Sequence, residues 1–369
     1  MQELINPNVL DMVPYTPGKP IEELQREHNL KRVVKLASNE NPLGVPPHVS
    51  RAITNEISQL NFYPENDSYY LKHRIADYNG IGADNVIVSA GSVELISMII
   101  RTFLLPDQTV LTSEKTFLMY KVWTVITGGK SAFIEAPMGD DYSYDLDALH
   151  RLVDDKTKII FIANPNNPTG TMINKQKTMD FIDNVPEDKI IVLDNAYQEY
   201  VSSPDEYPDG IEEAINRKNV IVLRTFSKIY SLSGSRVGYG VSNPEILSYL
   251  NRVKPTFNVT RLAQVAAMAS LENDDFKHQS TALNSKNKER LFFQLKEMGL
   301  HVIPSETNFL LFFPGIDTTE LNQRLLKEGV IIRPLHAFGI PEAMRITVGI
   351  AEDNDFFVEK LKKVLSEVG

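Results

Sequence analysis

The sequence predicts an α/β protein, with a mostly parallel central sheet that carries helices on both faces and a smaller α+β domain after it. Three observations lead to this fold class. Between about residues 33 and 240, short β-branched runs alternate with amphipathic segments of helix length. The runs are compact, mostly apolar and bounded by polar turns, which is typical of strands buried on both faces of a sheet. After about residue 245 the pattern changes to helices with only two strand-like segments.

The elements follow in order along the chain. The first thirty residues are rich in proline and asparagine and end in the polar EELQREHNLK, which favours an arm followed by a short helix. The strand candidates of the large domain are NVIVSAG (85–91), TVLTS (109–113), KIIFIAN (158–164), KIIVLDN (189–195) and NVIVLRT (219–225). The helix candidates between them span 92–103, 175–185 and 209–217.

The C-terminal third has a different pattern. A mostly helical stretch runs from 244 to about 298, strand candidates lie at 308–313 and 345–350, and a last helix covers 353–368. We therefore expect three parts, which are an N-terminal arm with a short helix (1–32), a large domain (33–250) and a small C-terminal domain (251–369).

Composition narrows the class of protein. The 369 residues are 42% apolar and 23% charged, enough to bury a large core, and the absence of cysteine excludes a disulfide framework. The net charge is −10 without a basic block, so neither nucleic acid nor an anionic membrane is an expected partner. The N-terminus lacks the apolar core of a signal peptide, and the longest apolar stretch is interrupted by Arg101. We expect a soluble, cytoplasmic protein, and no metal, because the histidines are scattered.

Polar residues follow three consecutive strand candidates, at the point where each strand ends. KIIFIA runs into NPNNPTG (164–170), KIIVL into DNAY (194–197), and NVIVLRTF into Ser227 and Lys228. Ligands of open parallel sheets bind beyond the carboxyl ends of the strands, so these residues should converge on one crevice. Taken singly, the first segment is an ordinary turn and Asp194 an ordinary helix cap. Their shared position favours a site.

Lys228 follows a buried strand, where a lysine is uncommon unless it has a function, because desolvation lowers its pKa towards that of a reactive amine. Schiff-base chemistry needs such an amine. The segment SLSGSR (231–236) offers hydroxyls, backbone N–H groups and an arginine for a phosphate. The turn at 90–92 begins a helix, whose N-terminus also binds anions. A phosphate site, a Schiff-base lysine and an aspartate that holds a proton together describe pyridoxal phosphate.

With these residues in place, the sequence resembles the fold-type I pyridoxal-phosphate aminotransferases of the class II subfamily, and within them the histidinol-phosphate aminotransferases. The stretches that carry the resemblance cover nearly the whole chain: LASNENPLG (36–44), NFYPE (61–65), GSVELI (91–96), TFLMY (116–120), ANPNNPTG (163–170), LDNAY (193–197), RTFSKIYSLSGSRVGYG (224–240), FNVT (257–260), SETNFLL (305–311) and MRITVG (344–349). It implies an enzyme of histidine biosynthesis that interconverts histidinol phosphate and 2-oxoglutarate with imidazole-acetol phosphate and glutamate.

The resemblance also implies roles for the residues around the cofactor ring. Lys228 would form the Schiff base and carry the proton between the substrate Cα and the cofactor C4′. Asp194 would pair with the pyridinium nitrogen, and Asn167 and Tyr197 would hydrogen-bond the ring O3′. Phe117 lies where the family stacks an aromatic ring on the cofactor. Lys228, Asp194 and Tyr197 are thus the expected catalytic residues.

A second group would hold the cofactor phosphate. Ser227 and Arg236 would bind it together with backbone N–H groups around Ser92 and Val93. Tyr63 lies where the family reaches this phosphate from the neighbouring subunit, so the resemblance implies a homodimer.

The remaining implied residues contact small-molecule substrates. Arg345 would take the substrate α-carboxylate as a bidentate pair. Asn39 borders the same site, and Tyr15 and Arg333 lie where the subfamily contacts the substrate side chain and its phosphate.

Four positions depart from the family pattern. Val93 replaces a common acid, Asn195 replaces the glutamate of Asp-Glu-Ala-Tyr, Lys115 stands where a proline is common, and Thr260 replaces the second asparagine of Asn-Val-Asn. None of them removes a catalytic group.

Other functions are compatible with part of this pattern. Aromatic-amino-acid aminotransferases and threonine-phosphate decarboxylase share most of the motifs and differ in the substrate pocket. A binding protein that keeps the fold without catalysis would not need Lys228, Asp194 and Arg345 together. A Rossmann dehydrogenase is excluded because no G-x-G-x-x-G follows the first strand.

Overall fold

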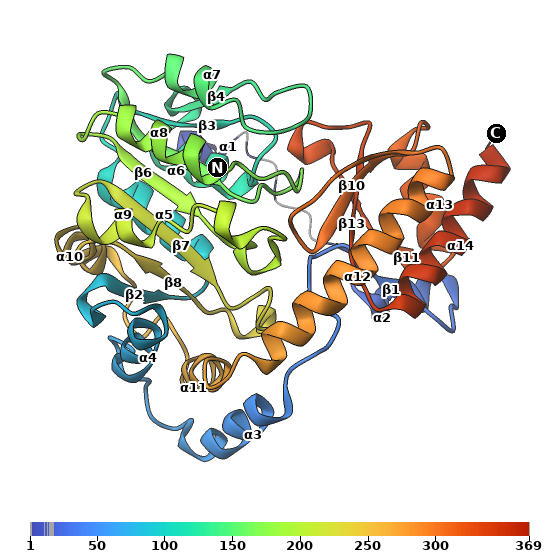
Figure 1. Ribbon diagram of the computed structural model, residues 1–369, viewed down its shortest axis with the longest axis horizontal. Helices are drawn as coiled ribbons and strands as arrows, with labels where there is room; N and C mark the ends of the chain where they lie inside the picture. Colours follow the sequence, from blue (N-terminus) through green and yellow to red (C-terminus); the bar gives the residue numbers. More distant parts are fainter. Residues whose placement is uncertain (1, 11, 13, 15–17, 369) are drawn as a thin grey trace.

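The computed structural model describes residues 2–10, 12, 14 and 18–368. The predicted substrate contact at Tyr15 therefore lies outside the described residues. Figure 1 shows a large part built on one sheet and a smaller part that contains the C-terminus, with helix α12 (Asp275–Glu297) running from one to the other. This arrangement confirms the predicted fold class. No described helix combines the length and the apolar content needed to cross a membrane.

The large part is built on a seven-stranded sheet with the order β2-β8-β7-β6-β5-β3-β4. All neighbouring strands run parallel except β8, which is antiparallel to both β2 and β7. Two of these strands were not predicted: β4 is a short edge strand, and in β8 two glycines weaken the strand signal. The strands are β2 (Val86–Ser89), β3 (Thr109–Ser113), β4 (Phe133–Ala136), β5 (Thr157–Ala163), β6 (Ile190–Asp194), β7 (Val220–Thr225) and β8 (Gly238–Val241).

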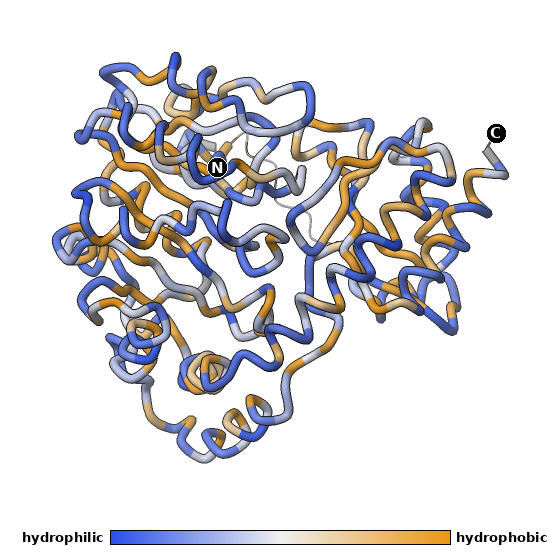
Figure 2. The backbone as a smooth tube through the Cα atoms, in the orientation of Figure 1, coloured by the Kyte–Doolittle hydropathy of each residue, from blue (hydrophilic) through white to orange (hydrophobic). Residues whose placement is uncertain are grey.

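Helices cover both faces of this sheet, and Figure 2 shows the strands as a hydrophobic layer between them. Alternate residues of β5 enter two separate cores, Ile160 and Ile162 on one face and Ile159 and Phe161 on the other. The first face carries α3 (Pro47–Glu56), α4 (Tyr69–Asn79), α7 (Leu146–Arg151), α8 (Lys175–Asn184), α9 (Ile211–Asn216) and α11 (Arg261–Ser270). The second carries α5 (Ser92–Phe103), α6 (Leu118–Gly128) and α10 (Pro244–Val253).

The small part contains an antiparallel sheet with the order β12-β13-β10-β9 and a two-stranded parallel pair, β1-β11. Its strands are β1 (Val34–Lys35), β9 (His301–Ile303), β10 (Phe309–Phe313), β11 (Val330–Ile331), β12 (Arg333–Pro334) and β13 (Met344–Thr347). Its helices are α2 (Ile21–His28), α13 (Thr318–Lys327) and α14 (Ala351–Val368), while α1 (Pro7–Leu10) packs on α6. The 3₁₀ helices are η1 (Gln2–Leu4), η2 (Ile57–Gln59), η3 (Ala83–Asn85), η4 (Lys130–Ala132), η5 (Gln198–Tyr200), η6 (Pro204–Glu206), η7 (Ser233–Ser235) and η8 (His336–Phe338).

The packing divides the chain differently from the expected boundaries at 32/33 and 250/251. Val34 pairs with Val330, so β1 belongs to the small part although it lies near the start of the expected large domain. Helix α11 packs on α3 and α4 and adds Ala263 and Ala266 to a core of the large sheet, although it falls within the expected small domain. Both differences arise from contacts between segments far apart in sequence, which local patterns do not report.

Candidate active site

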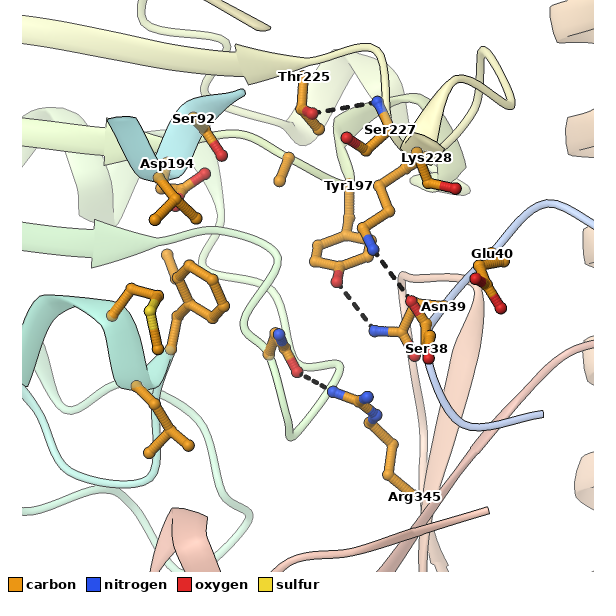
Figure 3. Close-up of a pocket in the computed structure, with 18 of the residues that line it drawn as sticks. Ser38, Asn39, Glu40, Ser92, Asp194, Tyr197, Thr225, Ser227, Lys228 and Arg345 are labelled. Carbon is orange, nitrogen blue, oxygen red and sulfur yellow. Dashed lines mark hydrogen bonds between the residues drawn. The ribbon is translucent and has the colours of Figure 1, made fainter. Parts of the chain in front are cut away.

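A cavity of about 390 Å³ lies at the carboxyl ends of β5, β6 and β7, where the large and small parts meet. Side chains from both parts line it, and Figure 3 shows them pointing towards one another. The predicted site residues that line this cavity are Asn39, Ser92, Val93, Phe117, Asn167, Asp194, Tyr197, Ser227, Lys228, Arg236, Arg333 and Arg345. The three strand ends singled out in the sequence thus meet in one place.

Lys228 lies at the centre of the cavity, three residues beyond the end of β7. Its Nζ donates a hydrogen bond to the Ser38 carbonyl oxygen at 3.2 Å and lies 5.6 Å from the centre of the Tyr197 ring. Burial lowers the pKa of Lys228 to about 7, and the positive charges of Arg345 and Arg236 act in the same direction. This lowered pKa favours the neutral amine near neutral pH, the form that attacks an aldehyde.

Asp194, the last residue of β6, is buried on the other side of the cavity. Its Oδ2 accepts a hydrogen bond from the Tyr120 hydroxyl at 2.7 Å, whereas its Oδ1 has no hydrogen-bond partner among the described residues. Burial raises the pKa of Asp194 to about 6, with the Tyr120 hydrogen bond acting against it. A buried acceptor without a donor is costly, so Oδ1 suits a ligand that brings an N–H group.

Gly91 and Arg236 shape the third side of the cavity. Gly91 has a φ of +83°, and a Cβ on it would lie 2.6 Å from Nη2 of Arg236, so this position requires glycine. Arg236 donates to the Ser227 hydroxyl at 3.3 Å and to the Ser233 carbonyl oxygen at 3.0 Å. Helix α5 begins at Ser92, directly after Gly91. A helix N-terminus, a guanidinium and serine hydroxyls gathered here form an anion site.

The small part closes the cavity with two arginines and an asparagine. Arg345 donates to the Ala37 carbonyl oxygen at 2.9 Å and to the side-chain oxygen of Asn167. The side-chain amide of Asn39 donates to the Tyr197 hydroxyl at 2.9 Å, as Figure 3 shows. Arg333 is the cross-strand partner of Arg345, so two cationic side chains stand next to each other on β12 and β13.

Tyr63 is not brought into the cavity of its own chain. It is 78% exposed and stacks on Phe257, with 4.6 Å between the ring centres. Exposure is what a residue that serves a neighbouring subunit would show, and that role stays a prediction.

The four departures from the family pattern lie in different surroundings. Val93 lines the cavity. Asn195 donates to the Asp209 carbonyl oxygen at 2.7 Å and does not line the cavity, and Thr260 caps α11 by accepting from Ala263 N at 3.2 Å. Lys115 has a φ of +52°, which a proline ring cannot adopt, so the departure matches the local backbone.

Sequence reasoning missed several cavity residues. Tyr120, which does not line the cavity itself but donates to Asp194 from inside α6, was also missed. Ala196 stands between Asp194 and Tyr197, and its small side chain gives no chemical signal. The others are Gly18, Ala37, Ser38, Glu40, Leu118, Met119, Ala163, Pro165, Thr225, Ser233 and Phe338.

These residues fit pyridoxal phosphate. The buried Oδ1 of Asp194 without a partner suits a protonated ring nitrogen. Lys228 supplies the amine, and the N-terminus of α5 with Arg236 suits the phosphate. Phe117 and Ala196 supply apolar surface for a ring. Each chemical group of the cofactor therefore has a matching group in the cavity.

Comparison with known proteins agrees with this geometry. The profile of the class I and II aminotransferases matches residues 31–361. The histidinol-phosphate aminotransferase of Anaeromyxobacter sp. (strain Fw109-5) is 43% identical over 98% of this chain and 99% of its own. Histidinol-phosphate aminotransferase 2 of Hydrogenovibrio crunogenus is 41% identical over 98% of this chain and 96% of its own.

Solved structures give the same result. The crystal structure of histidinol-phosphate aminotransferase from Sinorhizobium meliloti in complex with pyridoxal-5'-phosphate superposes with a TM-score of 0.89. It is 27% identical and covers 99% of this chain and 98% of its own. The chain belongs to the class I and II aminotransferase family, and its cofactor is pyridoxal 5'-phosphate.

Proposed function

We propose that this enzyme interconverts histidinol phosphate and 2-oxoglutarate with imidazole-acetol phosphate and glutamate, a step of histidine biosynthesis. The observation that carries the choice of substrate is the pairing of Arg333 with Arg345 across β12 and β13, in the wall of the cavity that holds Lys228.

Two like charges directly opposite each other in a sheet repel, and here both side chains are buried, with 9% and 6% exposed. Such a pair favours a doubly anionic ligand, because each guanidinium can bind a carboxylate or a phosphate through two N–H groups. Glutamate has two carboxylates, and histidinol phosphate has a phosphate. One pair of arginines therefore serves both half-reactions. Arg345 would bind the α-carboxylate of glutamate. Arg333 would bind the side-chain carboxylate of glutamate in one half-reaction and the phosphate of histidinol phosphate in the other.

The remaining cavity residues would hold the cofactor ring and transfer protons. Lys228 Nζ, whose pKa is lowered by burial, would take up the proton that leaves the substrate α-carbon. Asp194 Oδ1 would hold a proton on the ring nitrogen, and Tyr197 with Asn167 would hydrogen-bond the ring oxygen. When bound, the cofactor supplies an electron sink beside the α-carbon.

We also propose that the enzyme works as a homodimer in the cytoplasm. Exposed apolar side chains gather near Tyr63, on and before α4. They are Ile57, Leu60, Phe62, Tyr69 and Tyr70. A surface of this kind favours burial against another protein, and a second copy would bring its Tyr63 to the phosphate end of the neighbouring cavity. Sedimentation of the purified protein would measure its size in solution.

Two measurements test the proposal. Borohydride reduction of the purified protein should remove its visible absorption and fix the pyridoxyl mass on the peptide that contains Lys228; labelling of a different lysine would contradict the assigned site. With glutamate as donor, kcat/KM should be higher for imidazole-acetol phosphate than for aromatic keto acids. The reverse order would favour an aromatic aminotransferase.

A further inference from the structure

Two neighbouring walls of the ring site come from separate loops. Phe117 precedes α6, and Asn167 follows β5. Both side chains line the cavity. The cofactor ring can contact both side chains only if the two loops keep a fixed separation, so whatever ties the loops together also sets the geometry of the ring site.

The side chain of Asn166 makes this tie. It is fully buried, and its Oδ1 accepts from the Thr116 hydroxyl at 2.7 Å. Its Nδ2 donates to the Lys115 carbonyl oxygen at 3.1 Å and to the Thr169 hydroxyl at 2.9 Å. Thr116 and Lys115 belong to the loop that carries Phe117, whereas Thr169 belongs to the loop of Asn167. One amide therefore bridges both loops, and it is the immediate neighbour of Asn167.

The orientation of this amide is fixed by chemistry. The Lys115 carbonyl can only accept a hydrogen bond, so the amide nitrogen must face it, which leaves the amide oxygen for the Thr116 hydroxyl. Lys115 can present its carbonyl in this way with a φ of +52°. The Thr116 oxygen lies 2.9 Å from the Tyr144 hydroxyl, and that hydroxyl accepts from Ala163 N at 3.2 Å. The bridge is thus anchored to the end of β5 as well.

We infer that Asn166 is a positioning residue for the transamination reaction, which sets the separation of Phe117 and Asn167 through Thr116. This inference rests on the proposed function, because it assumes that the cofactor ring contacts both of those side chains. Asn166 acts through its neighbours and touches neither cofactor nor substrate.

The test compares the purified holoenzyme with three variants, Asn166→Ala, Thr116→Val and Thr116→Ser. The readouts are the dissociation constant of pyridoxal phosphate and the visible circular dichroism per mole of bound cofactor, which reports how the ring is held. Asn166→Ala and Thr116→Val should both weaken cofactor binding about tenfold and lower the dichroism, with kcat falling more than KM changes. Thr116→Ser keeps the hydroxyl and should restore wild-type values. The double variant Asn166→Ala/Thr116→Val should be no worse than either single one.

Asn219→Ala is the matched control. Asn219 is also buried and donates to the Lys189 carbonyl oxygen at 2.8 Å. It lies directly before β7, at the amino end of the strand, whereas the cavity lies at the carboxyl end. The Asn219→Ala variant should have a lower melting temperature and an unchanged circular dichroism of bound cofactor. The inference is overturned if Asn166→Ala behaves like this control, or if Thr116→Val keeps wild-type dichroism and affinity. A wild-type protein that binds no cofactor at Lys228 would overturn the proposed function instead.

Discussion

Replacing Asp194 by asparagine should stabilise the cofactor-free protein and inactivate the enzyme. Burial raises the pKa of Asp194 from 3.8 to about 6, so the folded state resists ionisation of this carboxyl. Above pH 6 the ionised form costs about 3 kcal/mol of folding free energy, taking 1.36 kcal/mol for each pKa unit. Asparagine removes this cost of ionisation, and its amide oxygen can still accept a hydrogen bond from the Tyr120 hydroxyl.

The sign of the pH dependence follows from the direction of the shift. A carboxyl whose folded-state pKa is raised contributes its stability below pH 3.8 and loses it as the pH rises through about 6. The advantage of the Asp194→Asn protein should therefore grow from about 1 kcal/mol at pH 4.5 to about 3 kcal/mol at pH 8. For a chain of this length, with about 2 cal/mol/K of unfolding entropy per residue, 3 kcal/mol corresponds to about 4 °C in melting temperature.

Calorimetry of the two cofactor-free proteins between pH 4.5 and 8 measures this difference. Asp154→Asn is a control that should lower the melting temperature instead of raising it, because hydrogen bonds from Thr157 lower the pKa of the Asp154 carboxyl and so favour its ionised form in the folded protein. With cofactor bound, the order of the two melting temperatures should reverse. The kcat of Asp194→Asn should fall about 10²–10³-fold, because no charge then holds the ring nitrogen protonated. Equal melting temperatures at pH 8, or an advantage that does not shrink towards pH 4.5, would refute the reasoning.

Three further predictions concern the cavity. Capture of pyridoxal by the cofactor-free protein should be half-maximal near pH 7, as stopped-flow absorbance would show, and a midpoint near 10 would mean that Lys228 is not desolvated. Tyr120→Phe removes the hydrogen bond that lowers the pKa of Asp194, so the acid limb of the kcat/KM profile should move to higher pH; an unchanged limb would count against this. Arg333→Ala should cost ~2–4 kcal/mol in kcat/KM for imidazole-acetol phosphate and much less for aromatic keto acids, whereas Arg345→Ala should weaken every α-carboxylate substrate alike.

The parts of the molecule that sequence reasoning could predict are those with a local signal. Compact, mostly apolar runs predicted β2, β3, β5, β6 and β7, because strands buried on both faces of a sheet are rich in apolar residues. Lys228 and Asp194 were found because charged residues at the ends of such strands are uncommon. The capping and spacing of 92–103 predicted α5 with its observed bounds.

What could not be predicted depends on contacts between distant segments. Tyr120 lies inside an apolar helix, and only the fold places its hydroxyl against Asp194. The packing of β1 could not be predicted for the same reason, because it pairs with β11 and no local pattern marks Val34 as a partner of Val330. The side-by-side arrangement of Arg333 and Arg345 depends on an antiparallel register that only the structure provides.

The pairing of β1 with β11 also sets an order of events during synthesis on the ribosome. All strands of the seven-stranded sheet have been made by Val241, whereas the partner of β1 ends at Ile331. At about 5–20 residues per second, the roughly 90 residues between them take about 5–20 s. During that interval the chain already contains Lys228, Asp194 and Arg236, but neither Arg333 nor Arg345, the two residues that we propose bind the substrate. The growing chain can therefore meet its cofactor before it is able to select a substrate.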